Sequence, residues 1–156
     1  MNAATRLTGL RLSLPPDTTP FSRADLVFFG LEHGGPSVEV RIFFNAPDAD
    51  ESTPTTDEAG FVGLFSIFGH GGCFGDEGHC DVPETRRPND LRPQHPLTPI
   101  TKHVTVTDAV RRLTAAGAQD VTVTIVPLLH DVPAYVPEEL CAEPVKYQRL
   151  SMVLYQ

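Results

Sequence analysis

The chain has 156 residues, a hydrophobic content of 40% and a formal net charge of −8. This length and apolar content suit one domain with a buried core and exclude an intrinsically disordered chain. Lys and Arg number only 12 and form no stripe, so we expect neither a nucleic-acid partner nor attraction to anionic membranes. The sequence shows no signal peptide and no stretch approaching the ~18 apolar residues of a membrane span, which predicts a cytoplasmic location.

From the N-terminus, alternation of apolar and polar side chains predicts strands at residues 6–14, 24–31 and 37–45. In the third segment Val38, Val40, Ile42 and Phe44 share one face, and Phe43 departs from the pattern. The loop 46–60 that follows is acidic and rich in Pro, Ser and Thr, with no apolar face. We therefore expect it to be an exposed connection between two strands.

The next strand is predicted at 60–68, and the long loop 69–101 follows it, rich first in Gly and then in Pro. A loop of this length is uncommon unless it is functional or tied down. A short strand at 102–106 then precedes the one helix that the sequence predicts. Thr107 is expected to be the N-cap of that helix, and Gly117 the residue that ends it.

Two more strands are predicted at 120–127 and 147–155, separated by a third long loop, 128–146. Within this loop Cys141 is expected to be a small, buried apolar residue. Residues 1–156 are therefore predicted to form a single, mainly β domain. Its fold class is an antiparallel β-sandwich of about seven strands, with one short helix and long loops at 46–60, 69–101 and 128–146.

The stretch GHGGCFGDEGHC, residues 69–80, concentrates side chains that bind metals. His70, Cys73, His79 and Cys80 form a set of ligand types suited to tetrahedral zinc or to copper(I), although their spacing is not that of a zinc finger. His95, from the far end of the loop, is a further candidate ligand. No intrinsic cofactor is otherwise expected.

Two other readings of the same stretch stay open. Cys73 and Cys80 are candidates for a disulfide that closes a small Gly-rich ring, or both thiols are free. The odd total of three cysteines argues against a scaffold built on disulfides. Nucleophile elbows and phosphate-binding loops are missing, so we do not expect the chain to be an enzyme by itself.

Three segments, taken in order, resemble the C-terminal β-sandwich domain of tyrosinases and polyphenol oxidases, the type 3 copper proteins. They are VEVRIFFNAPDAD, GFVGLFSIFGHG and VTVTDAVRRLTAAGAQDVTVTIVP. The residues that match the family pattern are Phe43, Phe44, Asn45, Phe61, Gly63, Phe65, His70, Leu113, Gly117, Ala118, Val121, Val123, Thr124, Val126 and Pro127. The resemblance covers most of residues 37 to 156, and the loop after residue 69 looks like the bacterial tyrosinase-like form.

The catalytic domain of that family is a helical bundle that binds two coppers through six histidines. This chain also has six histidines, but none form an H-x-x-x-H pair, so the catalytic half is absent. The resemblance therefore implies a non-catalytic accessory domain that docks on a tyrosinase-type copper oxidase domain, in the same or a separate chain. Such a domain would cover, stabilise or help load the dicopper site, with Phe74 or Tyr135 as candidate plugs.

Two alternatives come from other classes of protein. The first is an independent metal-binding protein that holds copper or zinc in the loop from His70 to Cys80. The second is a structural interaction domain with no site of its own.

Overall fold

In a computed structural model, the residues described are 4–69, 88–89, 99–132, 134 and 136–156. All seven predicted strands are present in this part of the chain. Their bounds are β1 Leu7–Ser13, β2 Arg23–Leu31, β3 Val38–Phe44, β4 Phe61–Ile67, β5 Ile100–Thr105, β6 Asp120–Leu128 and β7 Arg149–Tyr155. The helices are α1 Thr107–Ala115, α2 Glu138–Ala142 and the short 3-10 helix η1 Asp57–Ala59.

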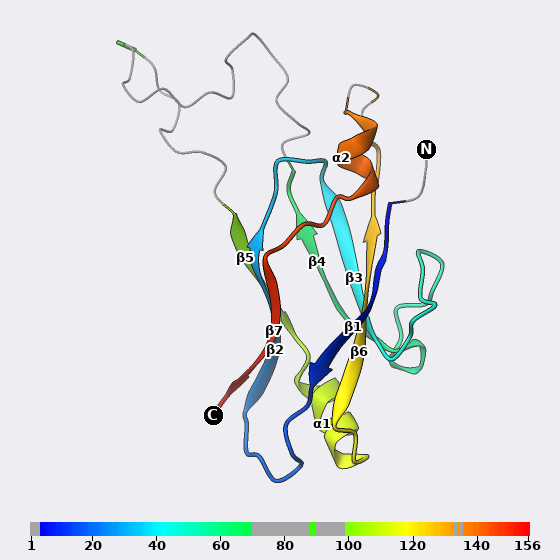
Figure 1. Cartoon of the computed structure of the whole chain (residues 1–156), viewed down its shortest axis with the longest axis vertical. Helices are drawn as coiled ribbons and strands as arrows, with labels where there is room; N and C mark the ends of the chain where they lie inside the picture. The colour runs from blue at the N-terminus through cyan, green and yellow to red at the C-terminus, as the bar shows by residue number, and fades with distance from the viewer. Residues whose placement is uncertain (1–3, 70–87, 90–98, 133, 135) are drawn as a thin grey trace.

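The strands form two antiparallel sheets that pack face to face (Figure 1). One sheet has four strands in the order β1-β6-β3-β4, and the other has three in the order β5-β2-β7. Helix α1 lies at one end of the sandwich and α2 near the other. The predicted fold class, a mainly β antiparallel sandwich, is confirmed.

The core consists of the inward-facing side chains of the central strands. Val40 and Ile42 on β3, and Leu26 and Phe28 on β2, are fully buried. The Phe28 ring lies 4.9 Å from the Phe65 ring of the opposite sheet, measured between centroids. Each such side chain contributes roughly 1.5–3 kcal/mol through its removal from water, so the inner faces hold the sheets together.

A second apolar cluster lies on the outer face of the four-stranded sheet, where the loop 46–60 contributes one buried residue. Ala49 in the loop 46–60 is 3% exposed and packs with Phe43, Val126 and Leu128. The loop is held down by Arg6, whose guanidinium donates to the carbonyl oxygens of Asp48 and Ala49. The loop is otherwise an exposed connection between the paired strands β3 and β4, as predicted. Phe43 packs against Ala49 and is buried, although it breaks the alternation of β3.

Helix α1 begins at Thr107, which is therefore not the N-cap that the sequence predicts. Val106 takes that position, and the Thr107 hydroxyl instead accepts a hydrogen bond of 3.0 Å from the backbone N–H of Ala24 on β2. The other end agrees with the prediction, since Gly117 follows the helix with a φ of 81°. Thr107 thus ties the helix to the sheet.

Helix α2 was not predicted. It lies within the loop 128–146 and carries Cys141, which is half-buried and not fully buried as expected. In the described part of the chain, neither α1 with nine residues nor α2 with five has the length or apolar character needed to cross a membrane.

One charged side chain is buried in the three-stranded sheet. The Asp25 side chain is 0% exposed, and its carboxylate accepts two hydrogen bonds from the Arg23 guanidinium, at 2.8 and 2.6 Å. His103 Nδ1 lies 3.5 Å from the same carboxylate. The Arg23 hydrogen bonds, aided by Thr105 and His103, hold the pKa of Asp25 below its usual value, although burial acts in the opposite direction.

We expect Asp25→Asn to lower the free energy of unfolding by about 1–3 kcal/mol at pH 7, because the amide leaves the Arg23 donors incompletely paired. Since the native pKa of Asp25 is lowered, its stabilisation is full above the ordinary aspartate pKa of about 4 and is lost at lower pH. Urea unfolding should therefore show a smaller difference in the free energy of unfolding between the wild type and Asp25→Asn at pH 3 than at pH 7. Asp120→Asn removes an exposed ion pair with Arg11 and is the control, because its free energy of unfolding should change little. A loss of stability in Asp25→Asn that is the same at both pH values would contradict this role for Asp25.

Candidate functional site

The metal-ligand, disulfide and plug candidates all lie outside the described residues. They are His70, Cys73, His79, Cys80 and His95 for the metal, Cys73 and Cys80 for the disulfide, and Phe74 and Tyr135 for the plug. Their arrangement stays a prediction. Among the residues that are described, no group of three or more His, Cys, Asp or Glu side chains is placed to hold a metal ion.

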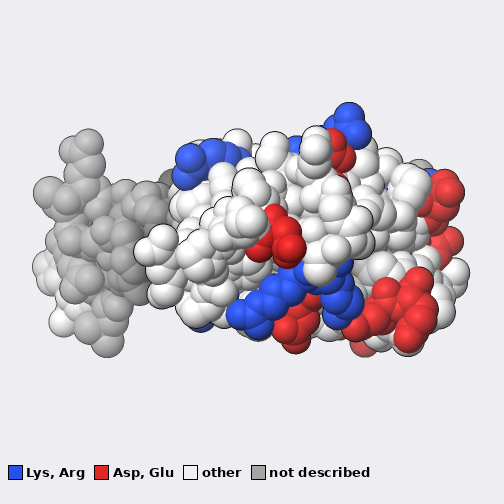
Figure 2. Space-filling view, turned by 90° about the horizontal axis from the view of Figure 1, so that it is seen from below, with Lys and Arg blue, Asp and Glu red and all other residues white. Residues whose placement is uncertain are grey.

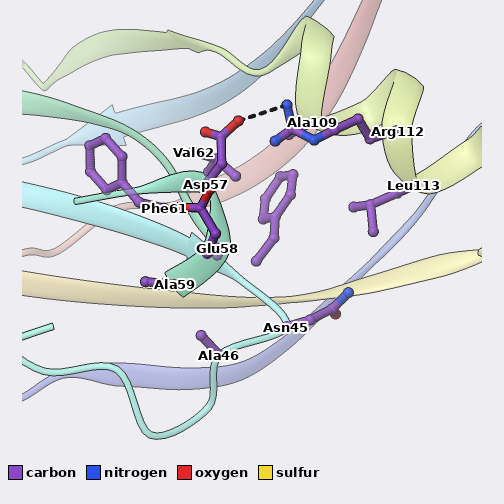
Figure 3. A pocket seen from close by; sticks show the side chains of 12 residues that line it. Asn45, Ala46, Asp57, Glu58, Ala59, Phe61, Val62, Ala109, Arg112 and Leu113 are labelled. Atoms are coloured by element: carbon purple, nitrogen blue, oxygen red, sulfur yellow. Dashed lines mark ion pairs between the residues drawn. The ribbon is translucent and has the colours of Figure 1, made fainter. Parts of the chain in front are cut away.

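A hollow in the described structure lies between α1 and η1, and we call it the α1–η1 groove. It has a volume of about 440 Å³. Figure 3 shows Asp57 and Glu58 entering from η1, and Arg112 and Leu113 facing them from α1. Apolar side chains from β3, β4 and α1 also line it: Phe44, Phe61, Val62 and Ala109.

The turn after β3 shapes the groove. Asn45 adopts a φ of 53°, and its side-chain oxygen accepts hydrogen bonds from the backbone N–H and the hydroxyl of Thr122. Gly60, which precedes β4, has a φ of 82°, and a Cβ built there would lie 2.5 Å from the carbonyl oxygen of Phe44. Backbone constraints at these two residues therefore fix the distance between η1 and the sheet.

The rim of the groove is charged. Arg112 Nη1 lies 3.0 Å from Asp57 Oδ2, and both side chains are more than half exposed. Hydrogen bonds from its own backbone N–H and from Thr56 lower the pKa of Glu58. A second hollow of about 240 Å³ lies on the other side of the ion pair, where Thr105 and Asp108 contribute to its lining. Figure 2 views this end of the molecule, and basic and acidic side chains lie side by side on it.

The described lining residues of the two hollows include no Cys, Ser or His, and their polar groups are carboxylates, threonine hydroxyls, the Asn45 amide and the Arg112 guanidinium. An apolar floor with a charged rim is typical of a site that holds a side chain or a small molecule. The sequence analysis did not find this groove, because α1 and η1 are far apart in the chain. Yet several residues that carry the family resemblance line it, among them Phe44, Asn45, Phe61 and Leu113.

Gly60→Ala should lower the free energy of unfolding by about 2 kcal/mol or more, because the Cβ adds a clash with backbone to an unfavourable positive φ. Gly117→Ala is the matched control, since its φ is 81° but a Cβ there would meet nothing within 4 Å. That control should cost only about 1 kcal/mol. Denaturant unfolding of the two variants measures the difference, and equal losses would show that the close approach to Phe44 is unimportant.

Comparison with known proteins places the fold. No protein-family model matches the chain, and no curated protein sequence matches it. Solved structures do match: a recombinantly expressed latent aurone synthase, which is a polyphenol oxidase, has a TM-score of 0.53 and 14% identity. A latent aurone synthase from natural source has a TM-score of 0.53 and 15% identity.

Both matches cover 99% of this chain but only 25% of the other, so the chain spans about a quarter of the length of these structures. The described β-sandwich is thus similar in fold to one part of a larger polyphenol oxidase. At sequence identities of 14% and 15%, the similarity establishes the fold and nothing about activity.

Proposed function

We propose that this chain is a non-catalytic accessory domain that docks on a tyrosinase-type dicopper domain and covers its active site. The observation that carries the proposal is the coverage of the structural match. Nearly the whole chain corresponds to a quarter of a latent polyphenol oxidase, which leaves the other three quarters to a separate catalytic part. The motifs shared with the C-terminal domains of that family support the same reading, and stabilising or loading the copper site are further roles of the docked domain.

The docking face we propose is the end of the sandwich where β4 ends and β5 begins. Phe68 directly follows β4 and is 83% exposed, by far the largest exposure of any large apolar side chain in the described structure. The loop 69–101, which contains the plug candidate Phe74, joins β4 to β5 at the same end. Exposed aromatic side chains are enriched where proteins bind each other.

A fusion protein tests this proposal. The chain would replace the corresponding domain of a latent polyphenol oxidase, behind a linker that a specific protease cuts, because tethering raises the effective concentration to the millimolar range. We expect catechol oxidation to rise at least about tenfold on cleavage and dilution, since a covered copper site admits no substrate.

In the same fusion, Phe68→Ala or Phe74→Ala should raise the activity before cleavage. Tyr155→Ala is the control. Tyr155 is also exposed, at 38%, but it pairs with Arg23 at the start of β2, which is the end of the sandwich away from Phe68. Equal activity before and after cleavage in the unmodified fusion would contradict the proposal.

A second candidate function, an independent copper- or zinc-binding protein, is favoured by the concentration of ligand types in residues 70–80. If it is correct, elemental analysis of the purified chain should find about one metal ion per chain, and Cys73→Ser or Cys80→Ser should release it. Cys141→Ser is the matched control and should keep the metal, because Cys141 belongs to α2 and not to the segment 70–80. A metal-free wild-type chain, prepared under reducing conditions with zinc or copper(I) supplied, would contradict this function.

A further inference from the structure

We propose that the free edge of β7 binds an extended segment of a partner protein, which enters the three-stranded sheet as a fourth strand next to β7. This proposal goes beyond the docking on a dicopper domain and does not depend on it. It rests on the unequal number of strands in the two sheets.

The two sheets come closest along β4 and β5 at one side, which places the missing strand at the other side. Strands β4 and β5 approach so closely that a Cβ on Gly63 would lie 2.5 Å from Cγ1 of Val104. Counting from that side, β4, β3 and β6 face β5, β2 and β7, and β1 faces no strand in the described structure. Strand β1 therefore overhangs the edge of the smaller sheet by one strand position.

The side chains around this empty position are apolar and incompletely covered. On β1 and β7 the residues that point between the sheets are only partly buried: Leu7, Leu10, Leu12, Leu150, Met152 and Leu154. Their neighbours in register on the central strands, such as Val123 beside Leu10 and Leu26 beside Met152, are 0% exposed. A strand added next to β7 would cover this row from the open side.

Strand β7 also lacks the features that usually block strand addition at a sheet edge. Its register with β2 runs through seven consecutive pairs without a shift. The other edge strands, β1, β5 and β4, each show a register shift in their pairing. Strand β7 contains no Pro and a single charged residue, Arg149. It is therefore the one regular edge of the sandwich in the described part of the chain.

The overhang of β1 excludes a second copy of this chain as the occupant. If two copies joined β7 to β7, the partner's β7 would fill the empty position, and its β6 would have to lie opposite, where β1 already lies. Only a single extended strand fits without this overlap. The occupant is consequently a linear segment, and it pairs by backbone hydrogen bonds as in other cases of β-strand addition.

The side chains around the position define the chemistry of the segment. Alternate residues would face the leucines of β1 and β7, so they should be apolar. The residues between them would point outward beside Arg149, which lies 4.2 Å above the Phe29 ring and forms no ion pair with a described carboxylate. Acidic residues at the outward positions would complement this charge. The partner segment therefore alternates apolar and acidic residues.

A peptide of seven residues that alternates Val with Glu, blocked at both ends, is the probe. We expect it to slow the hydrogen exchange of β7 amides at least about tenfold at saturation, because exchange then needs the added strand to open. The same peptide with N-methyl groups on alternate backbone nitrogens keeps its side chains but cannot pair along that edge, and it should bind at least about tenfold more weakly.

A charge exchange tests the position of the segment. Arg149→Glu should lower the affinity for the Val-Glu peptide roughly two- to fivefold and raise the affinity for a Val-Lys peptide by a similar factor. This is the range expected for an exposed ion pair. Arg11→Glu, on the outer face of the other sheet, is the matched control and should not change the preference. Urea unfolding verifies that both variants are folded.

Several results with the peptides would overturn the proposal. They are equal binding of the N-methylated peptide, protection of β1 or β4 amides in place of β7, and no β7 protection at millimolar peptide. Protection of β7 without peptide that rises with protein concentration would also overturn it, because the occupant would then be a second copy.

Discussion

The side chains that β2, β3 and β6 bury between the sheets are the contact on which the rest of the structure depends. These central strands are covered on both sides by neighbouring strands, and their inward residues are almost fully excluded from water. Strand β3 is covered on its outer face as well, because Phe43 packs under Ala49. This burial fixes the positions of the strands. The loops and the helices α1 and α2 are connected to these strands, and the α1–η1 groove is lined in part by them.

The residues that carry the family resemblance act mainly in packing and in turns. Phe44 and Phe61 form part of the groove floor, Asn45 closes the turn after β3 through Thr122, and Gly117 ends α1. In the described part of the chain, these residues therefore preserve the shape of the sandwich, and their likeness to polyphenol oxidases is one of fold.

Much of the fold could be predicted from the sequence because burial on one face leaves a period of two. Burial alternates in this way along β5 and the second half of β4, whereas β2 and β6 are buried almost continuously. Their order in the sheets could not be predicted, since pairing partners such as β1 and β6 lie more than a hundred residues apart. The loop 46–60 is the exposed connection that the sequence predicts, but the buried contact of Ala49 with Phe43 leaves no pattern in the sequence. Thr107 was misjudged because its hydroxyl binds a neighbouring strand, a tertiary contact that local spacing does not reveal. The α1–η1 groove could not be predicted for the same reason, because it forms between segments that are far apart in the sequence. The ligand candidates from His70 to His95 lie outside the described residues.

The two surfaces we propose for partners lie on different parts of the sandwich, so one molecule can use both. The Phe68 end is where β4 ends, whereas the β7 edge runs along the side that is remote from the β4–β5 junction. A strand bound at β7 would cover the half-buried leucines of β1 and would therefore stabilise the native sandwich by mass action.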